Sequence, residues 1–254
     1  MQLEQQLRAA RAQKDILLMT HLVLGYPSFE VNREVIRQMV ENGVDIIELQ
    51  IPFSEPMADG PVIMMANQEA INAGATVKQC FEFAAEMAAT YDIPFLFMTY
   101  YNILFKYGEE EFFKKSKEIG IKGFIVPDLP PEEGDKYLAL ARQYELAPIQ
   151  IFAPTSREER MRFLAANGAG FIYCVARKGV TGKKSSFNEE FATYMARCRA
   201  ATDLPLAVGF GIADRSDVET LTGKADIAVI GTATIKLVEE KGPAAVGPFI
   251  ASLR

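Results

Sequence analysis

The stretch Val44-Asp-Ile-Ile-Glu-Leu-Gln-Ile51 is a short run of mostly β-branched and other apolar residues, interrupted by Asp45, Glu48 and Gln50 and followed by Pro52. This pattern is typical of a parallel strand that is covered on both faces. Seven further runs of the same kind recur along the chain, and a longer amphipathic stretch separates each from the next. The eight strand candidates are Ile16–Leu24, Val44–Ile51, Ile93–Thr99, Ile121–Val126, Ala147–Phe152, Ala169–Val175, Leu204–Val208 and Asp226–Ile230.

The amphipathic stretches that follow these runs predict helices. They are Phe29–Glu41, Val77–Thr90, Glu109–Glu118, Glu132–Tyr144, Arg157–Asn167, Asn188–Ala200, Ser216–Thr222 and Ala233–Glu240. Eight strand–helix pairs in 254 residues predict an α/β protein, a single (β/α)8 TIM-barrel domain over residues 1–254 with an N-terminal helix. A doubly wound open sheet is the alternative, but Leu22–Pro27 lacks the glycine fingerprint that usually follows its first strand.

Composition excludes several classes of protein. With 49% hydrophobic residues and a formal net charge of −6, the chain is neither disordered nor suited to nucleic acid. Its three cysteines are widely spaced and form no CxxC pair, so we expect neither a disulfide framework nor a metal site. The polar start and the short apolar runs predict a cytoplasmic protein that is neither secreted nor inserted in a membrane.

Two connections exceed the usual length of a βα loop. One follows the second strand, from Pro52 to about Ala75, and the other follows the sixth, from Ala176 to about Phe187. Because the active face of a TIM barrel is built from the loops after its strands, both are candidate lids or substrate loops.

Two carboxylates are placed on this predicted active face. Glu48 lies inside an apolar strand, where a carboxylate is unfavourable unless it faces a polar cavity, and Asp59 follows in the next loop. Both are candidates for proton transfer. The alternatives are a buried Glu48 satisfied by hydrogen bonds, and an Asp59-Gly60 pair that only forms a turn. Glu55 in the same loop can equally be solvated or face a partner.

Glycines close the last two strands, in Val208-Gly-Phe-Gly-Ile212 and Ile230-Gly-Thr-Ala-Thr-Ile235. TIM barrels often bind phosphate with backbone amides at these two positions. Gly209, Gly211 and Gly231 would let the backbone approach an anion, and Thr232 adds a hydroxyl. The alternative is that these glycines merely allow tight turns. The segment around Thr181-Gly182 could close over the same ligand.

The remaining polar residues give weaker signals. His21, the only histidine, lies in an apolar strand and is interpreted as a core imidazole. Tyr100 and Tyr173 are core or rim residues that an aromatic substrate could also contact. No Schiff-base lysine or Ser-His-Asp arrangement is evident, so the residues indicate proton transfer on a phosphorylated substrate.

Four motifs resemble those of tryptophan synthase α subunits, in the same order along nearly the whole chain. They are Glu48-Leu-Gln-Ile-Pro-Phe-Ser-Glu-Pro-Met-Ala-Asp-Gly-Pro61, Arg177-Lys-Gly-Val-Thr-Gly182, Val208-Gly-Phe-Gly-Ile212 and Gly231-Thr-Ala-Thr-Ile-Lys236. The resemblance implies retro-aldol cleavage of indole-3-glycerol phosphate to indole and glyceraldehyde 3-phosphate, with no metal or organic cofactor.

The resemblance also implies roles for single residues. Glu48 would protonate C3 of the indole ring, and Asp59 would take or stabilise the indole N–H proton. Tyr100 and Tyr173 would surround the indole and the glycerol chain, and Thr181 would order Asp59 when the lid closes. The phosphate cradle would be formed by Gly182, Gly211, Gly231 and Thr232.

The resemblance implies a partner as well. Family members pass indole to a pyridoxal-phosphate β subunit in an α2β2 complex, and the second-strand loop and Pro127-Asp-Leu-Pro would lie near that interface. The chain departs from the family pattern at Gln50, where glycine is usual, and at Glu55, where aspartate is usual. Two alternatives stay open: another barrel enzyme acting on a sugar phosphate, because such enzymes share the glycine loops, and a weakly catalytic activator of a β subunit, because Gln50 and Glu55 are altered.

Overall fold

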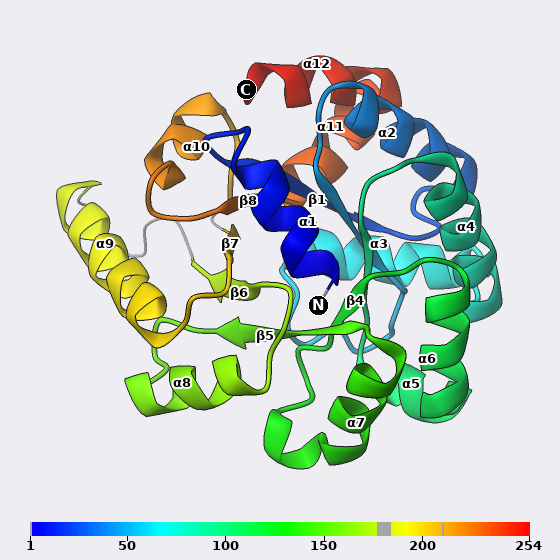
Figure 1. Ribbon diagram of the computed structural model, residues 1–254. Helices are drawn as coiled ribbons and strands as arrows, with labels where there is room; N and C mark the ends of the chain where they lie inside the picture. The colour runs from blue at the N-terminus through cyan, green and yellow to red at the C-terminus, as the bar shows by residue number, and fades with distance from the viewer. Residues whose placement is uncertain (1, 177–183, 210) are drawn as a thin grey trace.

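The computed structural model describes residues 2–176, 184–209 and 211–254, and these residues form a closed parallel barrel (Figure 1). Each strand pairs in parallel with the next, and β8 closes the barrel on β1. The strands are β1 (Leu17–Val23), β2 (Ile46–Gln50), β3 (Phe95–Met98), β4 (Gly123–Ile125), β5 (Ala147–Phe152), β6 (Ile172–Val175), β7 (Leu206–Gly209) and β8 (Ile227–Ile230). The predicted (β/α)8 barrel is confirmed.

Helices surround the barrel wall (Figure 1). They are α1 (Gln2–Arg11), α2 (Phe29–Glu41), α3 (Pro61–Asn72), α4 (Val77–Thr90), α5 (Tyr101–Tyr107), α6 (Glu109–Glu118), α7 (Asp135–Tyr144), α8 (Glu158–Ala166), α9 (Lys184–Ala201), α10 (Arg215–Leu221), α11 (Thr232–Lys241) and α12 (Val246–Ser252), with short 3₁₀ turns at Pro131–Glu133 and Pro243–Ala245. Every predicted helix is present within a few residues of its expected bounds.

Side chains alternate along each strand between the barrel interior and the layer under the helices. On β2, Ile47 and Leu49 join the large outer core, whereas Ile46 joins the interior cluster. Glu48 and Gln50 share the direction of Ile46, because residues two apart in a strand point the same way. The alternation therefore directs both polar side chains of β2 into the barrel.

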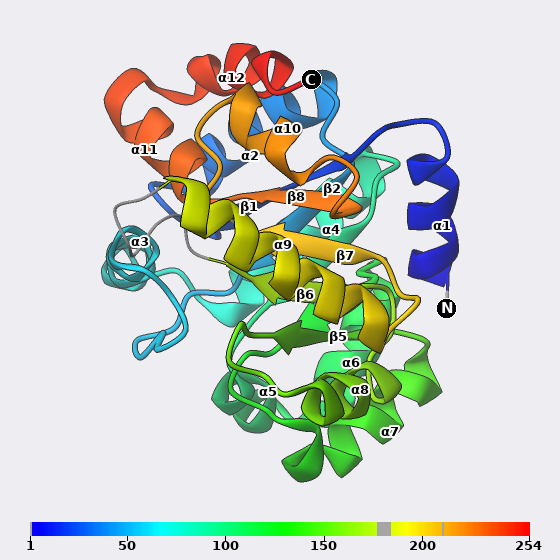
Figure 2. The same ribbon diagram turned by 90° about the vertical axis from the view of Figure 1, so that its left-hand side faces the viewer.

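The helix α1 closes one end of the barrel. Its Leu3 and Leu7 are 2% exposed and pack into the interior cluster of strand residues. Figure 2 shows α1 at one end of the barrel and α3 at the other. The end that is covered by α1 therefore has a packed apolar floor, and the opposite end is left for a site.

The connection after β2 is long, as expected, but it is not all loop. Pro61 begins α3, where a residue without a free N–H is favourable, and the helix buries Ala66 and Ala70 against Val23. Its sequence is apolar on most sides, so it lacked the amphipathic signal used to find the other helices. In the connection after β6, residues 177–183 lie outside the described residues, and α9 begins at Lys184, earlier than predicted.

Candidate functional site

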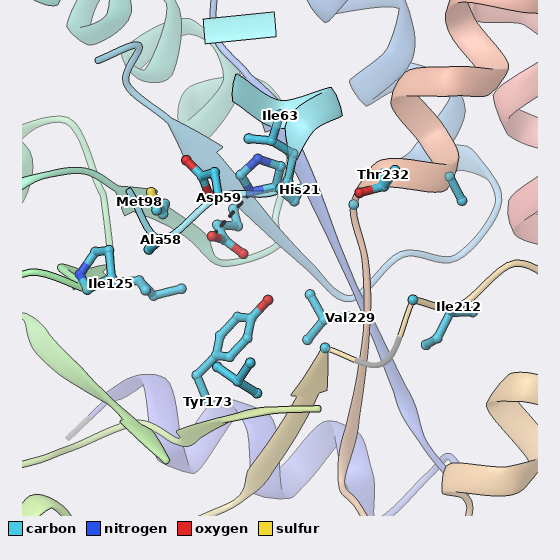
Figure 3. A pocket seen from close by; sticks show the side chains of 18 of the residues that line it. His21, Ala58, Asp59, Ile63, Met98, Ile125, Tyr173, Ile212, Val229 and Thr232 are labelled. Atoms are coloured by element: carbon cyan, nitrogen blue, oxygen red, sulfur yellow. Dashed lines mark ion pairs between the residues drawn. The ribbon is translucent and has the colours of Figure 1, made fainter. Parts of the chain in front are cut away.

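A cavity of about 520 Å³ opens at the carboxyl ends of the strands (Figure 3). This is the size and the place expected for a ligand site in a TIM barrel. Its walls are mostly apolar, with a few polar groups. The residues that line it include His21, Glu48, Asp59, Ile63, Met98, Ile125, Tyr173, Gly209, Gly211, Val229, Gly231, Thr232, Ala233 and Lys236.

Glu48 faces this cavity from the middle of β2. Its side chain is almost fully buried, and its Oε1 lies 3.2 Å from Nδ1 of His21, which is directly opposite on β1. Within the described residues, its other oxygen, Oε2, is buried and has no hydrogen-bond partner. A buried carboxylate oxygen normally has a hydrogen-bond partner in a folded protein, so this oxygen is available to bind a ligand.

His21 is buried, as a core imidazole is, but it also lines the cavity, which the sequence did not indicate. It is 5% exposed and pairs with Glu48. Burial is the largest single influence and lowers the pKa of His21, but the charge and hydrogen bond of Glu48, together with Asp59 and Gln50, leave the pKa raised. Only the register of β1 against β2 reveals this pairing, because the two residues are far apart in sequence.

Asp59 is held in place by two hydrogen bonds to one oxygen. Nε2 of Gln50 donates to its Oδ2 at 2.7 Å, and the hydroxyl of Tyr100 donates to the same atom at 3.1 Å. The Tyr100 hydroxyl also accepts from the N–H of Ala58, at 3.1 Å. The pKa of Asp59 is raised, chiefly by burial and also by the nearby Glu48, although the hydrogen bonds from Gln50 and Tyr100 and the nearby His21 act against that rise.

The two tyrosines occupy different positions. Tyr100 is fully buried behind Asp59, with its ring stacked on Phe53 at 5.0 Å between centroids. Tyr173 lines the cavity from β6, and burial raises its pKa well above the usual value, so its hydroxyl stays protonated at neutral pH. A Cβ at Gly209 would lie 3.0 Å from the Tyr173 hydroxyl oxygen, so glycine there leaves room for the ring.

The far side of the cavity carries the features of an anion site. The helix α11 begins just after Gly231 without any side-chain cap, so the amides of Thr232 and Ala233 have no partner within the helix. Gly211 adopts φ of +71°, a conformation that favours glycine. Lys236, one turn further along α11, also lines the cavity, and sequence reasoning gave it no role of its own.

These groups lie on separate walls. Figure 3 shows the His21 ring beside Asp59, Tyr173 reaching toward them, and Thr232 at the start of a helix on another side. Apolar residues such as Ile63, Ile125 and Val229 line the space. Two expected site residues, Thr181 and Gly182, lie outside the described residues.

Among the described residues, no group of three or more His, Cys, Asp or Glu side chains is arranged to hold a metal ion. None of the described helices has the length and apolar character needed to cross a membrane.

Together, the closed barrel and the cavity at the carboxyl ends of its strands are typical of a TIM-barrel enzyme, here with two carboxylates on one side and a helix N-terminus on another. A family model described as "Tryptophan synthase alpha chain" matches residues 7–246. Tryptophan synthase alpha chains from Desulfotalea psychrophila and Desulforapulum autotrophicum are 67% and 61% identical to this chain, and these matches cover 100% and 99% of both chains. The chain belongs to the tryptophan synthase alpha chain family.

Solved structures agree. The tryptophan synthase subunit alpha from Legionella pneumophila is 28% identical with a TM-score of 0.90, covering 99% of this chain and 96% of the other. A tryptophan synthase structure from Mycobacterium tuberculosis is 29% identical, with the same TM-score and coverage. The resemblance drawn from the sequence is thus confirmed, and with it a lyase activity in tryptophan biosynthesis. Members of this family work with a β subunit.

Asn67 should anchor the loop that carries Asp59. It is fully buried on α3, accepts from the N–H of Phe53 at 2.9 Å and donates to the carbonyl of Ile63 at 2.8 Å. We expect Asn67→Leu to lower the free energy of unfolding by about 1–3 kcal/mol, because it leaves the Phe53 amide unpaired. Urea unfolding measures the change, and Gln68→Leu, at an exposed site on the same helix, is the control. Equal stability of the two variants would contradict this anchoring role.

Proposed function

We propose that this site cleaves indole-3-glycerol phosphate to indole and glyceraldehyde 3-phosphate, with Glu48 and Asp59 as its catalytic residues. The observation that carries the proposal is the unpartnered Oε2 of Glu48, which is buried in the wall of a largely apolar cavity. An aromatic ring can occupy such a cavity, and the anion site at α11 lies on another wall. A ligand with an aromatic end and a phosphate end matches both features.

Glu48 acts first as the acid. It gives its proton to C3 of the indole ring, which leaves positive charge on the ring nitrogen, and Asp59 stabilises that charge by accepting the indole N–H. The hydroxyl proton on the carbon attached to C3 then leaves to a base at the site, and the bond from that carbon to C3 breaks. Its electron pair returns to the ring, so indole and an aldehyde form, and the proton gained at C3 balances the proton lost from the hydroxyl.

The phosphate contributes binding energy remote from the bond that breaks. We assign it to the amides at Gly231, Thr232 and Ala233 and to Gly211, since a helix N-terminus with unpaired amides favours an anion. Lys236 adds a positive charge from the same helix. From the sequence alone, we expect Gly182 to belong to this phosphate cradle and Thr181 to belong to the lid.

A β subunit in an α2β2 complex is the proposed partner. Large apolar side chains are exposed at Met57, in the loop before α3, and at Phe105 on α5, with 82% and 63% exposure. The loop before α3 projects from the barrel in Figure 2. Exposed apolar side chains on a projecting loop are typical of a contact surface, and Glu55 lies in the same loop. We propose a cytoplasmic location, based on the family.

Replacing Glu48 by Gln tests the acid. Glu48→Gln keeps the shape of the side chain but removes its transferable proton, so we expect kcat for indole release to fall by about 10²–10⁴. Binding of indole-3-glycerol phosphate, measured by calorimetry, should change only a few fold. The control is Glu30→Gln at an exposed position on α2. Indole release by Glu48→Gln at the unmodified rate would overturn the assignment.

Lys236→Met tests the anion site. Removing the charge should raise KM for indole-3-glycerol phosphate about 3–10-fold and leave kcat nearly unchanged, because a charged hydrogen bond to phosphate contributes to binding throughout the reaction. Lys241→Met, in the last turn of the same helix, controls for the loss of a positive charge. Steady-state kinetics at low and high salt measure the effect. If Lys236→Met has the same KM as the unmodified protein, the phosphate binds elsewhere.

A further inference from the structure

We propose that His21 and Gln50 form a polar bridge between Glu48 and Asp59, which keeps one transferable proton on the Glu48–His21 pair and keeps Asp59 ionised. Both are positioning residues for the reaction. The catalytic consequence of the bridge rests on the proposed function, but its hydrogen-bond pattern does not.

The bridge is built from adjacent inward positions of two strands. His21 on β1 is opposite Glu48 on β2, and Gln50 is two residues further along β2, on the same side of the strand. His21 reaches Glu48 through Nδ1, and Gln50 reaches Asp59 through Nε2. The remaining polar atoms of the two bridging side chains are Nε2 of His21 and Oε1 of Gln50. Both are buried, and neither has a hydrogen-bond partner within the described residues, so the bridge would join two otherwise unsatisfied groups.

The hydrogen bonds at Asp59 fix the orientation of the Gln50 amide. Oδ2 of Asp59 accepts from Gln50 and from the Tyr100 hydroxyl, as an ionised carboxylate does. Since the NH₂ end of Gln50 faces Asp59, its carbonyl oxygen is the end left for His21. A carbonyl oxygen only accepts, so Nε2 of His21 must carry a hydrogen to satisfy it.

The hydrogen on Nε2 of His21 determines how Nδ1 of the same ring can bond to Glu48. A neutral imidazole with its hydrogen on Nε2 has a lone pair on Nδ1, so Glu48 must then be protonated and donate to it. If the imidazole carries both hydrogens, Glu48 is ionised and accepts from Nδ1. In both cases one proton lies between Oε1 of Glu48 and Nδ1 of His21. The pattern excluded is a neutral ring with its hydrogen on Nδ1, because a bare Nε2 would then face the Gln50 oxygen.

The electrostatics of the site agree with this pattern. Gln50 raises the pKa of His21 as a hydrogen-bond partner, alongside Glu48 and Asp59 and against the effect of burial. Burial leaves the pKa of Asp59 above its usual value, and the hydrogen bond from Gln50 is the largest influence that lowers it, toward the ionised carboxylate. The other titratable groups facing this cluster are the hydroxyls of Tyr100 and Tyr173, whose raised pKa values keep them protonated, and Lys236 of α11, which also lines the cavity.

This arrangement suits the proposed reaction. Glu48 needs a proton to give to C3, and its carboxyl group turns to carry the protonated oxygen from Nδ1 of His21 to the ligand. Asp59 needs a negative charge to accept the indole N–H. After the proton leaves to C3, the Glu48–His21 pair takes the hydroxyl proton and returns to its starting state. Without the bridge, the two carboxylates in this cavity would compete for a proton. With it, Glu48 shares a proton with His21 and Asp59 stays ionised.

The first test reads the hydrogen-bond pattern without any substrate. His21 is the only histidine of the chain, so ¹⁵N NMR of untagged full-length protein reports its tautomer and titration without ambiguity. We expect hydrogen on Nε2 across neutral pH. Gln50→Met should lose that preference and lower the pKa of His21, whereas Gln150→Met, at a buried outward position of β5, should change neither. A neutral ring with hydrogen on Nδ1, or an unchanged titration in Gln50→Met, would overturn the bridge.

The second test reads its catalytic effect. Without the Gln50 hydrogen bond the pKa of Asp59 rises, so in Gln50→Met the acidic limb of kcat/KM for indole release should move to higher pH. Gln50→Met and His21→Phe should also be non-additive, with a coupling of at least about threefold in kcat. If Gln50 and His21 had only a structural role, each variant would lower the activity without moving the acidic limb of kcat/KM. The loss in the double variant would then equal the product of the two single losses. If neither the unmodified protein nor any variant releases indole, but NMR still finds the hydrogen on Nε2 of His21, the proposed function is wrong and the bridge is supported.

Discussion

The buried contact between Glu48 and His21 is the interaction on which the site depends. A carboxylate inside a barrel loses its hydration, and this loss must be offset by a partner or by a polar cavity. Here β1 and β2 are in a register that sets His21 directly opposite, and one carboxylate oxygen is left without a protein partner among the described residues. A shift of one residue in that register would turn one of the two side chains outward and separate the pair.

The rest of the barrel serves to keep that contact at one end of a cavity. The helix α1 seals the opposite end with Leu3 and Leu7, so the interior below the site is packed. Helix α11 begins at another wall with unpaired amides, and apolar side chains lie between. Proton transfer and anion binding are thus separated within one space, which allows remote binding energy to act on the reacting bond.

Particular elements show how far sequence reasoning reached. The eight strands were predictable because each is covered on both faces and is therefore almost wholly apolar, and Glu48 stood out against that background. Helix α3 was not predicted, because it is apolar on most sides and has no periodic signal. A single imidazole in an apolar strand gives no sign of its partner, so the sequence predicts only a core residue at His21. Lys236 has no local signal that predicts its place at the cavity.

The sequence by itself determined the class of fold, the family, and the candidate carboxylates and glycines, because hydrophobic period and motif spacing are local properties of the chain. Only the tertiary structure decided that His21 pairs with Glu48 and that Gln50 and Tyr100 together hold Asp59. Those contacts join residues from different strands and loops. They exist only once the register of the barrel has brought these residues within hydrogen-bond distance, and no local pattern encodes that register.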